Sequence, residues 1–236
     1  MVSRILDVIK EFLMEVEKDN PFNLVLKGGT ALSIYYLNHH RESEDLDFDA
    51  DRPLIKKYKE IQNYLTAILE KLKQKQIIKD FKITKSDFAS TNRYHIKFEL
   101  KTHKIIYSKA DIDFVELPEN LIKVGQLNLY PAERIFITKA LTFVNRKEFK
   151  DLYDLSHLVR KVNMASFKKK ENVIQLIEEV IQTIQQEDLK KIFKSAFRNV
   201  DLKFKNLKES QLDNFIKKTI NELRVLINKL KSLEED

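Results

Sequence analysis

Three carboxylates alternate along the short run DLDFDA. Asp45, Asp47 and Asp49 occupy every second position, with Leu46 and Phe48 between them. In a β-strand this spacing puts the acids on one face and the apolar pair on the other. Neighbouring like charges raise one another's pKa unless a cation lies between them. Mg²⁺ is such a cation, and it typically takes one or two carboxylates plus substrate phosphates. The alternative is a solvated acidic strand that binds nothing.

A second pair of acids, Asp111 and Asp113 in the run KADIDFV, has the same spacing. If its strand is a neighbour of the first, carboxylates from both strands lie close together. Two metal ions about 3.5–4 Å apart could then clamp an in-line phosphoryl displacement. The second pair therefore favours a metal and phosphate site over a solvated strand.

The chain has only three glycines, and two of them are adjacent in Gly28-Gly29-Thr30. This tripeptide falls between a predicted strand and a predicted helix. Backbone N–H groups at the start of a helix bind phosphate, and glycine permits close approach of the backbone. Thr30 adds a hydroxyl that can cap the helix or contact a phosphate oxygen. Taken alone, Gly-Gly is also typical of an ordinary tight turn.

The length and composition of the chain limit the classes of protein to which it can belong. A length of 236 residues suits one large domain or two small ones. The net charge of +7, from 43 basic and 36 acidic residues, is compatible with phosphate binding and equally with a merely soluble surface. There is no cysteine, which excludes disulfides and cysteine-based sites, and the five histidines lack zinc-site spacing. No apolar run is long enough to span a membrane, so we expect a cytoplasmic protein without membrane partners.

Periodicity predicts an α/β half over residues 1–120 and a helical half over 121–236. Strands are expected at 22–27, 45–50, 79–85, 93–100 and 104–116, the last three antiparallel because the links between them are short. Helices are expected at 1–19, 30–38, 53–75, 131–145, 149–162, 166–183, 186–197 and 210–232. Lysines at 168–170 and in LKKIFKSAFR predict a basic helical surface, either solvated or a track for an RNA backbone.

The order of G-G-T, a helix, D-x-D and a later acid resembles the nucleotidyltransferase superfamily with the DNA-polymerase-β-like fold. More closely, LKGGTALS and HRESEDLDFD resemble the AbiEii-type nucleotidyltransferases, which are toxins of type IV toxin–antitoxin and abortive-infection systems. The later stretch LYPAERIFITKALTFVNRKEFKDLYDLSHL, at 129–158, is similar to that family's downstream pattern. The resemblance implies an α+β fold in which a mixed sheet flanked by helices precedes a helical bundle.

The resemblance also implies roles for individual residues. Asp45 and Asp47 match the metal-binding D-x-D, and Asp111 matches the third acid, with Asp113 as its alternate. The residues that would bind substrate are Gly28, Gly29, Thr30, Arg41, Ser43 and Lys139. Lys139 would neutralise a triphosphate or the departing pyrophosphate.

On a helix, Asp151 and Asp154 share a face at spacing i, i+3. Asp154 matches the acid of the family's D-x-Y-D-L element and is expected to act in catalysis with Asp45, Asp47, Asp111 and Lys139. The alternative is that both acids only favour the start of their helix through its dipole.

The implied reaction is Mg²⁺- or Mn²⁺-dependent transfer of a nucleotidyl group from an NTP, with release of pyrophosphate. The expected acceptor is an RNA end, such as a tRNA 3′ end, although a protein hydroxyl is also compatible. The implied biological role is that of a toxin neutralised by a separately encoded antitoxin. Two alternatives stay open: a non-catalytic nucleotide- or RNA-binding module that keeps the fold, and a metal-dependent nuclease that shortens RNA.

Overall fold

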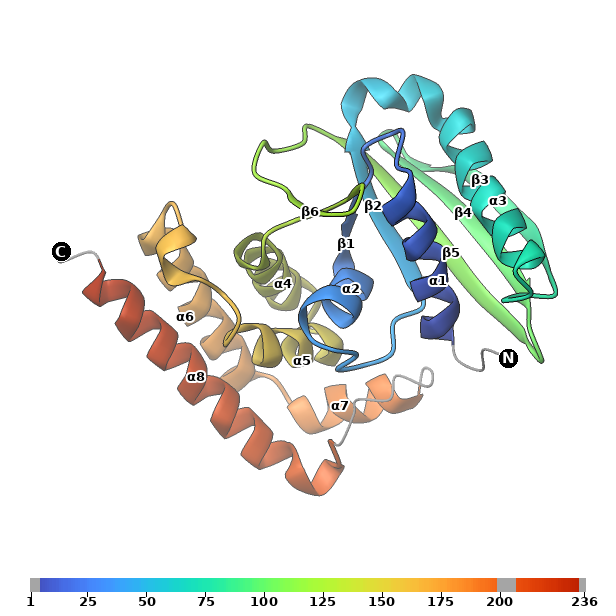
Figure 1. The fold of residues 1–236 in the computed structure, drawn as a ribbon. Helices are drawn as coiled ribbons and strands as arrows, with labels where there is room; N and C mark the ends of the chain where they lie inside the picture. The colour runs from blue at the N-terminus through green and yellow to red at the C-terminus, as the bar shows by residue number, and fades with distance from the viewer. Residues whose placement is uncertain (1–4, 199–206, 234–236) are drawn as a thin grey trace. The chain divides into compact units, whose positions relative to one another are not determined.

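The computed structural model describes residues 5–198 and 207–233 (Figure 1). These residues form two compact units. The first comprises Met1–Ile34 and Ser43–Tyr130, and the second comprises Tyr35–Glu42 and Pro131–Asp236. The predicted division near residue 120 stays a prediction of domain organisation, but the structure adds that the short segment Tyr35–Glu42 belongs with the helical half.

The first unit is built on a seven-stranded mixed sheet with strand order β3-β4-β5-β2-β1-β7-β6. Strands β3, β4 and β5 are antiparallel neighbours, β5 and β2 are parallel, and β1 pairs antiparallel with β2 and parallel with β7. The strands are β1 (Val25–Lys27), β2 (Asp45–Asp51), β3 (Asp80–Ser90), β4 (Arg93–Lys101), β5 (Ile105–Val115), β6 (Ile122–Val124) and β7 (Leu127–Leu129).

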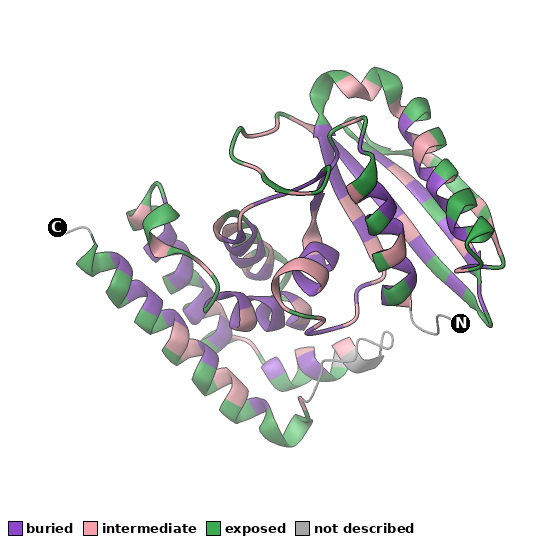
Figure 2. Ribbon diagram, viewed as in Figure 1, coloured by how far each residue is buried: buried purple, intermediate pink, exposed green. Residues whose placement is uncertain are grey.

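One face of this sheet is apolar and the other is polar, because side chains alternate along each strand. Figure 2 shows how buried positions alternate with more exposed ones along β4. Leu46 and Phe48 of β2 are buried, whereas Asp45, Asp47 and Asp49 lie on the opposite face. The helices α1 (Ile5–Lys18) and α3 (Tyr58–Gln74) pack against each other and contribute the apolar stripes that complete this core (Figure 1).

Short irregular helices connect the strands of the first unit. The helix predicted at 30–38 is instead a four-residue α2 (Gly28–Ala31) followed by a π-helical turn, η1 (Leu32–Tyr36). The 3₁₀ helix η2 (Arg52–Lys57) leads into α3, and Asp51 caps it by accepting a hydrogen bond from the backbone N–H of Arg52. The hairpin of β6 and β7, which turns at Gly125, was not predicted because each strand has only three residues.

The second unit is helical. Its helices are α4 (Ala132–Arg146), α5 (Phe149–Leu158), η3 (Met164–Ser166), α6 (Lys170–Gln186), α7 (Leu189–Arg198), η4 (Glu209–Gln211) and α8 (Leu212–Ser232). Nearly every residue of α5 is buried (Figure 2), so this helix forms the centre of the unit. Phe149 contacts Phe193 edge to face, with ring centroids 4.9 Å apart, and also packs against Phe215 of α8.

The predicted fold class is confirmed: a mixed α/β unit precedes a set of helices. The predicted helix over 1–19 is present as α1, although residues 1–4 lie outside the described part. Strand β3 runs on to Ser90, through residues that the sequence placed in a loop. In the described part of the chain, no helix has the length and apolarity needed to cross a membrane.

The core position Leu65 of α3 provides a test of this packing. Replacing Leu65, which is fully buried, with alanine should lower the free energy of unfolding by about 2–5 kcal/mol, since a cavity remains. Urea unfolding followed by circular dichroism measures the change. The matched control is Ile105→Ala, at a position that is 51% exposed in the same unit; it should change stability by no more than about 0.5 kcal/mol. Equal effects of the two substitutions would contradict the assigned core.

Candidate active site

The register of the central strands brings the two acidic pairs side by side. In the parallel ladder of β2 and β5, Asp47 lies opposite Asp111 and Asp49 lies opposite Asp113. The two acidic strands are thus neighbours, which was the condition for their carboxylates to lie close together. Asp45 has Lys109 as its partner in the same ladder.

The Gly-Gly turn lies directly against the D-x-D strand. Gly28 has a φ of +74°, a left-handed conformation that favours glycine, and a Cβ atom at this position would lie 2.4 Å from Oδ2 of Asp47. In the ladder of β1 and β2, the preceding residue, Lys27, lies opposite Asp47. Glycine is thus required at residue 28 both by the backbone and by the carboxylate beside it.

Thr30 and Ser43 connect the turn to the start of β2. The hydroxyl of Thr30 donates to the backbone carbonyl of Asp45, and its Oγ1 lies 2.8 Å from Oγ of Ser43. Both side chains are buried. The Thr30 hydroxyl therefore holds the turn against the strand, and a phosphate at this turn would be bound by backbone N–H groups, including those of Gly29 and Thr30.

Asp49 and Asp113 are neutralised by fixed partners. Nζ of Lys27 bridges them, lying 2.6 Å from Oδ2 of Asp113 and in a hydrogen bond with Oδ1 of Asp49. Asp113 also accepts two hydrogen bonds from Arg93, and Asp49 accepts one from the Tyr130 hydroxyl. Burial alone would raise the pKa of Asp113, but Arg93 and Lys27 hold that pKa below its usual range.

Asp47 lies in a different environment from this pair. Burial raises its pKa, and the nearby charges of Asp45 and Asp111 raise it further, while Lys109 and Lys27 offset only part of the effect. Oδ1 of Asp111 is buried and has no hydrogen-bond partner, although His95 Nδ1 lies 3.3 Å away. Asp47 and Asp111 are therefore the two acids whose environment most favours an added cation.

The donor chemistry of these acids fits Mg²⁺, which needs only one or two carboxylates when phosphates complete its shell. Asp47 and Asp111 supply two such groups in register. Within residues 5–198 and 207–233, no group of three or more His, Asp or Glu side chains is arranged to hold a metal ion. The expected metal site therefore stays a prediction, with Asp45, Asp47 and Asp111 as its residues. The contacts of Asp113 favour a structural role over metal binding.

A second charged cluster lies in the helical unit, around Asp154. Arg41 donates to both carboxylate oxygens of Asp154, at 2.6 and 2.8 Å. His40 Nε2 lies 2.7 Å from Oδ1, and Lys139 Nζ lies 2.7 Å from Oδ2. Lys139 also donates to Asp151 at 2.8 Å. Both acids are fully buried, so their charges depend on these partners.

The pKa directions agree with a fixed ion cluster. Burial alone would raise the pKa of Asp154, but Arg41 and Lys139 hold it well below its usual range. Burial lowers the pKa of His40 in spite of Asp154, which favours the neutral ring with the proton on Nε2. That ring stacks on Tyr153, with centroids 5.8 Å apart.

The structure thus places Arg41, Lys139 and Asp154 together in one buried cluster of the helical unit. Burial alone would lower the pKa of Lys139, but Asp154 and Asp151 raise it, so the ammonium group stays charged. The predicted roles of Lys139 in triphosphate binding, of Arg41 in substrate binding and of Asp154 in catalysis stay predictions. Their contacts support a structural role: they fasten the segment Tyr35–Glu42 to α4 and α5.

The family follows from comparison with known proteins. A family model described as "Nucleotidyl transferase AbiEii toxin, Type IV TA system" matches residues 8–225. The chain belongs to the AbiEii family. No curated protein matches the sequence.

Two solved structures from Helicobacter pylori have the same fold as this AbiEii family member. One is JHP933, with 22% sequence identity and a TM-score of 0.66; the alignment covers 100% of this chain and 97% of the JHP933 chain. The other is a proposed nucleotidyltransferase, also with 22% identity and a TM-score of 0.66, covering 99% of each chain. At this identity the likeness shows the fold alone.

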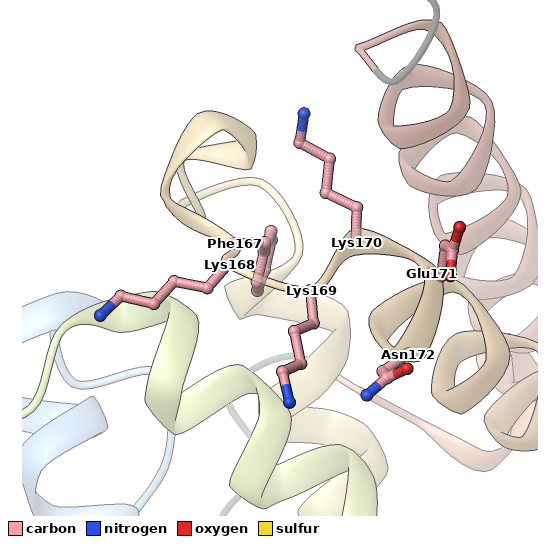
Figure 3. A pocket seen from close by; sticks show the side chains of 6 residues that line it. All are labelled: Phe167, Lys168, Lys169, Lys170, Glu171 and Asn172. Carbon is pink, nitrogen blue, oxygen red and sulfur yellow. The ribbon is translucent and has the colours of Figure 1, made fainter.

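The basic segment of this AbiEii chain does not form a converging anion site. Phe167–Asn172 line a surface cavity of 540 Å³ at the start of α6. Figure 3 shows the side chains of Lys168, Lys169 and Lys170 pointing in different directions. Lys170 instead donates to the backbone carbonyl of Leu233. The role of this segment as an RNA track stays a prediction, and the later part of LKKIFKSAFR has side chains outside the described residues.

Several charged residues beside the AbiEii acids were missed by the sequence analysis. Lys27, Arg93 and Lys109 are the cations that pair with the acids of β2 and β5. Lys109 could have been found, because it precedes Asp111 by two positions on the same strand face. Arg93 could not, since its pairing with Asp113 depends on the register between β4 and β5.

The buried cluster predicts a specific stability loss. Asp154→Asn removes the carboxylate that pairs with Arg41 and one of the two carboxylates that contact Lys139, and it should lower the free energy of unfolding by about 3–5 kcal/mol at pH 7. Arg41 and Lys139 hold the folded-state pKa of Asp154 well below that of an ordinary aspartate. Its contribution is therefore complete above about pH 5 and is lost as the pH falls through 4 towards the folded pKa. The difference between wild type and variant should shrink over that range, as measured by urea unfolding.

The control for this prediction is Asp213→Asn, at an exposed position of the same unit. It should change stability by no more than about 0.5 kcal/mol. A loss below about 1 kcal/mol for Asp154→Asn, or a loss that does not depend on pH, would contradict the structural role of the cluster.

Proposed function

We propose that the protein transfers a nucleotidyl group from an NTP to the 3′ end of an RNA, with a divalent metal ion held by Asp45, Asp47 and Asp111. One observation carries the proposal: the parallel register that puts Asp47 opposite Asp111, with the Gly28 turn against Asp47. Membership of a family of nucleotidyl transferase toxins supports it. The metal is Mg²⁺ or Mn²⁺, since carboxylate and phosphate oxygens suit both.

In the proposed reaction, the acceptor hydroxyl oxygen attacks the α-phosphorus of the NTP. A new P–O bond forms, the bond to the β-phosphate bridging oxygen breaks, and pyrophosphate leaves. The hydroxyl proton passes to a base, for which Asp111 is the candidate because its Oδ1 lacks a hydrogen-bond partner. A bound metal ion supplies Lewis-acid stabilisation of the charge that develops on the phosphate oxygens.

The other residues of the chain orient the reactants. The backbone N–H groups at Gly29 and Thr30 bind phosphate, and Thr30 keeps that turn attached to β2 through the carbonyl of Asp45. The pair of Asp49 and Asp113, with Lys27 between them, fixes the strands on which the reacting acids lie. The contacts of Lys139 and Arg41 with Asp154 support a role in holding the helical unit together, and their roles in substrate binding stay predictions.

The biological role that we propose is growth inhibition, relieved by a separately encoded antitoxin. The family to which the chain belongs consists of toxins of type IV toxin–antitoxin systems. The acceptor that we favour is an RNA end, such as that of a tRNA. The chain carries a net charge of +7, and a positively charged protein attracts the phosphate backbone of RNA.

The first test is incubation of the protein with total RNA, Mg²⁺ and each NTP labelled on the α-phosphate. Label should enter RNA, and chelation of the metal should abolish the transfer. Oxidation of the RNA 3′ diol with periodate should also abolish it, whereas transfer to a protein hydroxyl would persist. Shortening of the RNA would indicate a nuclease, and NTP binding without any transfer would indicate a non-catalytic module.

Asp47→Asn should lower label transfer by at least about 100-fold, the scale of losing one group that stabilises transition-state charge. The matched control is Asp51→Asn, which changes an exposed carboxylate at the end of the same strand. It should retain activity near the wild-type level, because asparagine also caps helices. Equal losses in both variants, or no loss in Asp47→Asn, would remove Asp47 from the site.

Gly28→Ala should lose both stability, by about 1–2 kcal/mol, and label transfer, since its Cβ displaces the carboxylate of Asp47. Gly125→Ala is a strict control, because Gly125 also has a positive φ and its Cβ would meet the carbonyl oxygen of Glu17 at 2.4 Å. It should lose stability and keep its activity per folded molecule. Thermal unfolding and the labelling assay give the two readouts; equal activity losses in the two variants would refute the role of the turn.

A further inference from the structure

Lys109 is a basic residue whose ammonium group lies between two of the acids, Asp45 and Asp111. It lies on β5 two residues before Asp111, and in the parallel ladder it is the partner of Asp45. Its Nζ is 2.7 Å from Oδ2 of Asp111 and 3.6 Å from Oδ2 of Asp45. One ammonium group thus bridges carboxylates from two strands, which is the position that a bound cation would take between them.

The second bridging lysine of this sheet, Lys27, provides a contrast. Lys27 bridges Asp49 and Asp113, and both of these acids have a further partner in Tyr130 or Arg93. The side chain of Lys27 is 26% exposed and that of Lys109 is 36% exposed. The carboxylates that Lys27 joins are thus held from several sides, as expected of a permanent structural pairing.

Asp111, one of the two carboxylates that Lys109 joins, is held less completely than Asp113. Oδ1 of Asp111 is buried without a hydrogen-bond partner, and Asp45 is 45% exposed. Asp47, between them, has a carboxylate buried next to two like charges. Lys109 and Lys27 offset only part of the repulsion that Asp45 and Asp111 exert on Asp47. An entering divalent ion would neutralise more of the negative charge of the three acids.

We propose that Lys109 is a resident counter-ion of the acid group, and that a divalent metal ion displaces its ammonium group from Asp111 and Asp45. This inference rests on the proposed function, because it concerns the same metal site. The flexible four-carbon stem of lysine allows the ammonium group to move away without a change in the strand. Lys109 then has two effects: it stabilises the metal-free fold, and it weakens metal binding by competing for the same oxygens.

The test compares Mn²⁺ affinity in wild type, Lys109→Met and Lys97→Met, measured by electron paramagnetic resonance of free Mn²⁺ with no nucleotide present. Lys97 is a matched control, because it lies opposite Lys109 on β4, is exposed, and carries the same charge. Lys109→Met should bind Mn²⁺ roughly tenfold more tightly or better, since the nearest competing charge is gone. Lys97→Met should bind it as wild type does.

Thermal unfolding gives a second readout. Without metal, Lys109→Met should unfold at a lower temperature than wild type, and saturating Mn²⁺ should raise its unfolding temperature by more than it raises that of wild type. Lys109→Arg keeps the charge and should restore stability without metal. If Lys109→Met fails to fold, Lys109→Gln gives the same comparison, because it removes the charge and keeps a hydrogen-bond donor.

Unchanged or weaker Mn²⁺ affinity in Lys109→Met would overturn the inference, as would equal tightening in Lys97→Met or an absence of Mn²⁺ binding in every variant. A purely structural lysine would lower stability without tightening metal binding. The metal-affinity test and the label-transfer test can fail independently. Label transfer by wild type with unchanged affinity in Lys109→Met refutes only the counter-ion, whereas tighter binding without label transfer refutes only the transferase.

Discussion

The repulsion between carboxylates on one sheet face is the constraint on which this structure depends. The parallel pairing of β2 with β5 aligns two acidic pairs and cannot be changed without moving the apolar residues that alternate with them. Every strand that flanks this pair accordingly provides a cation: Lys27 comes from β1 and Arg93 from β4, while β5 itself provides Lys109. The polar face of the sheet is thus organised by charge compensation, and the opposite face by burial.

The two halves of the acidic face differ in how completely they are compensated. Asp49 and Asp113 have several donors each, which suits a supporting role. Asp47 and Asp111 lie one step along the same strands and lack comparable partners. Side chains on one face of a strand recur every two residues. A single pair of strands therefore carries a fully compensated pair of acids next to a pair that is compensated only in part.

Much of the fold could be predicted from the sequence because its elements are long and strongly periodic. The five helices after residue 131 and the strands around Asp47 and Asp111 were predicted close to their observed bounds. The short β6 and β7 and the π-helical turn η1 carry too few residues for a periodic signal. Spacing alone predicted the two acidic strands, and the family resemblance selected Asp45, Asp47 and Asp111 among their acids. The partners of Lys139 and Arg41 required the tertiary contacts of Asp154.

The assignment of Tyr35–Glu42 to the helical unit has a consequence for how the chain can be divided. A fragment that begins at residue 131 would contain Asp151 and Asp154 but would lack His40 and Arg41. Its central helix would then hold two buried carboxylates with Lys139 as their closest remaining cation. During synthesis, Arg41 likewise leaves the ribosome more than a hundred residues before its partner exists. The helical unit is thus complete only when both Tyr35–Glu42 and the helices after residue 131 have been made.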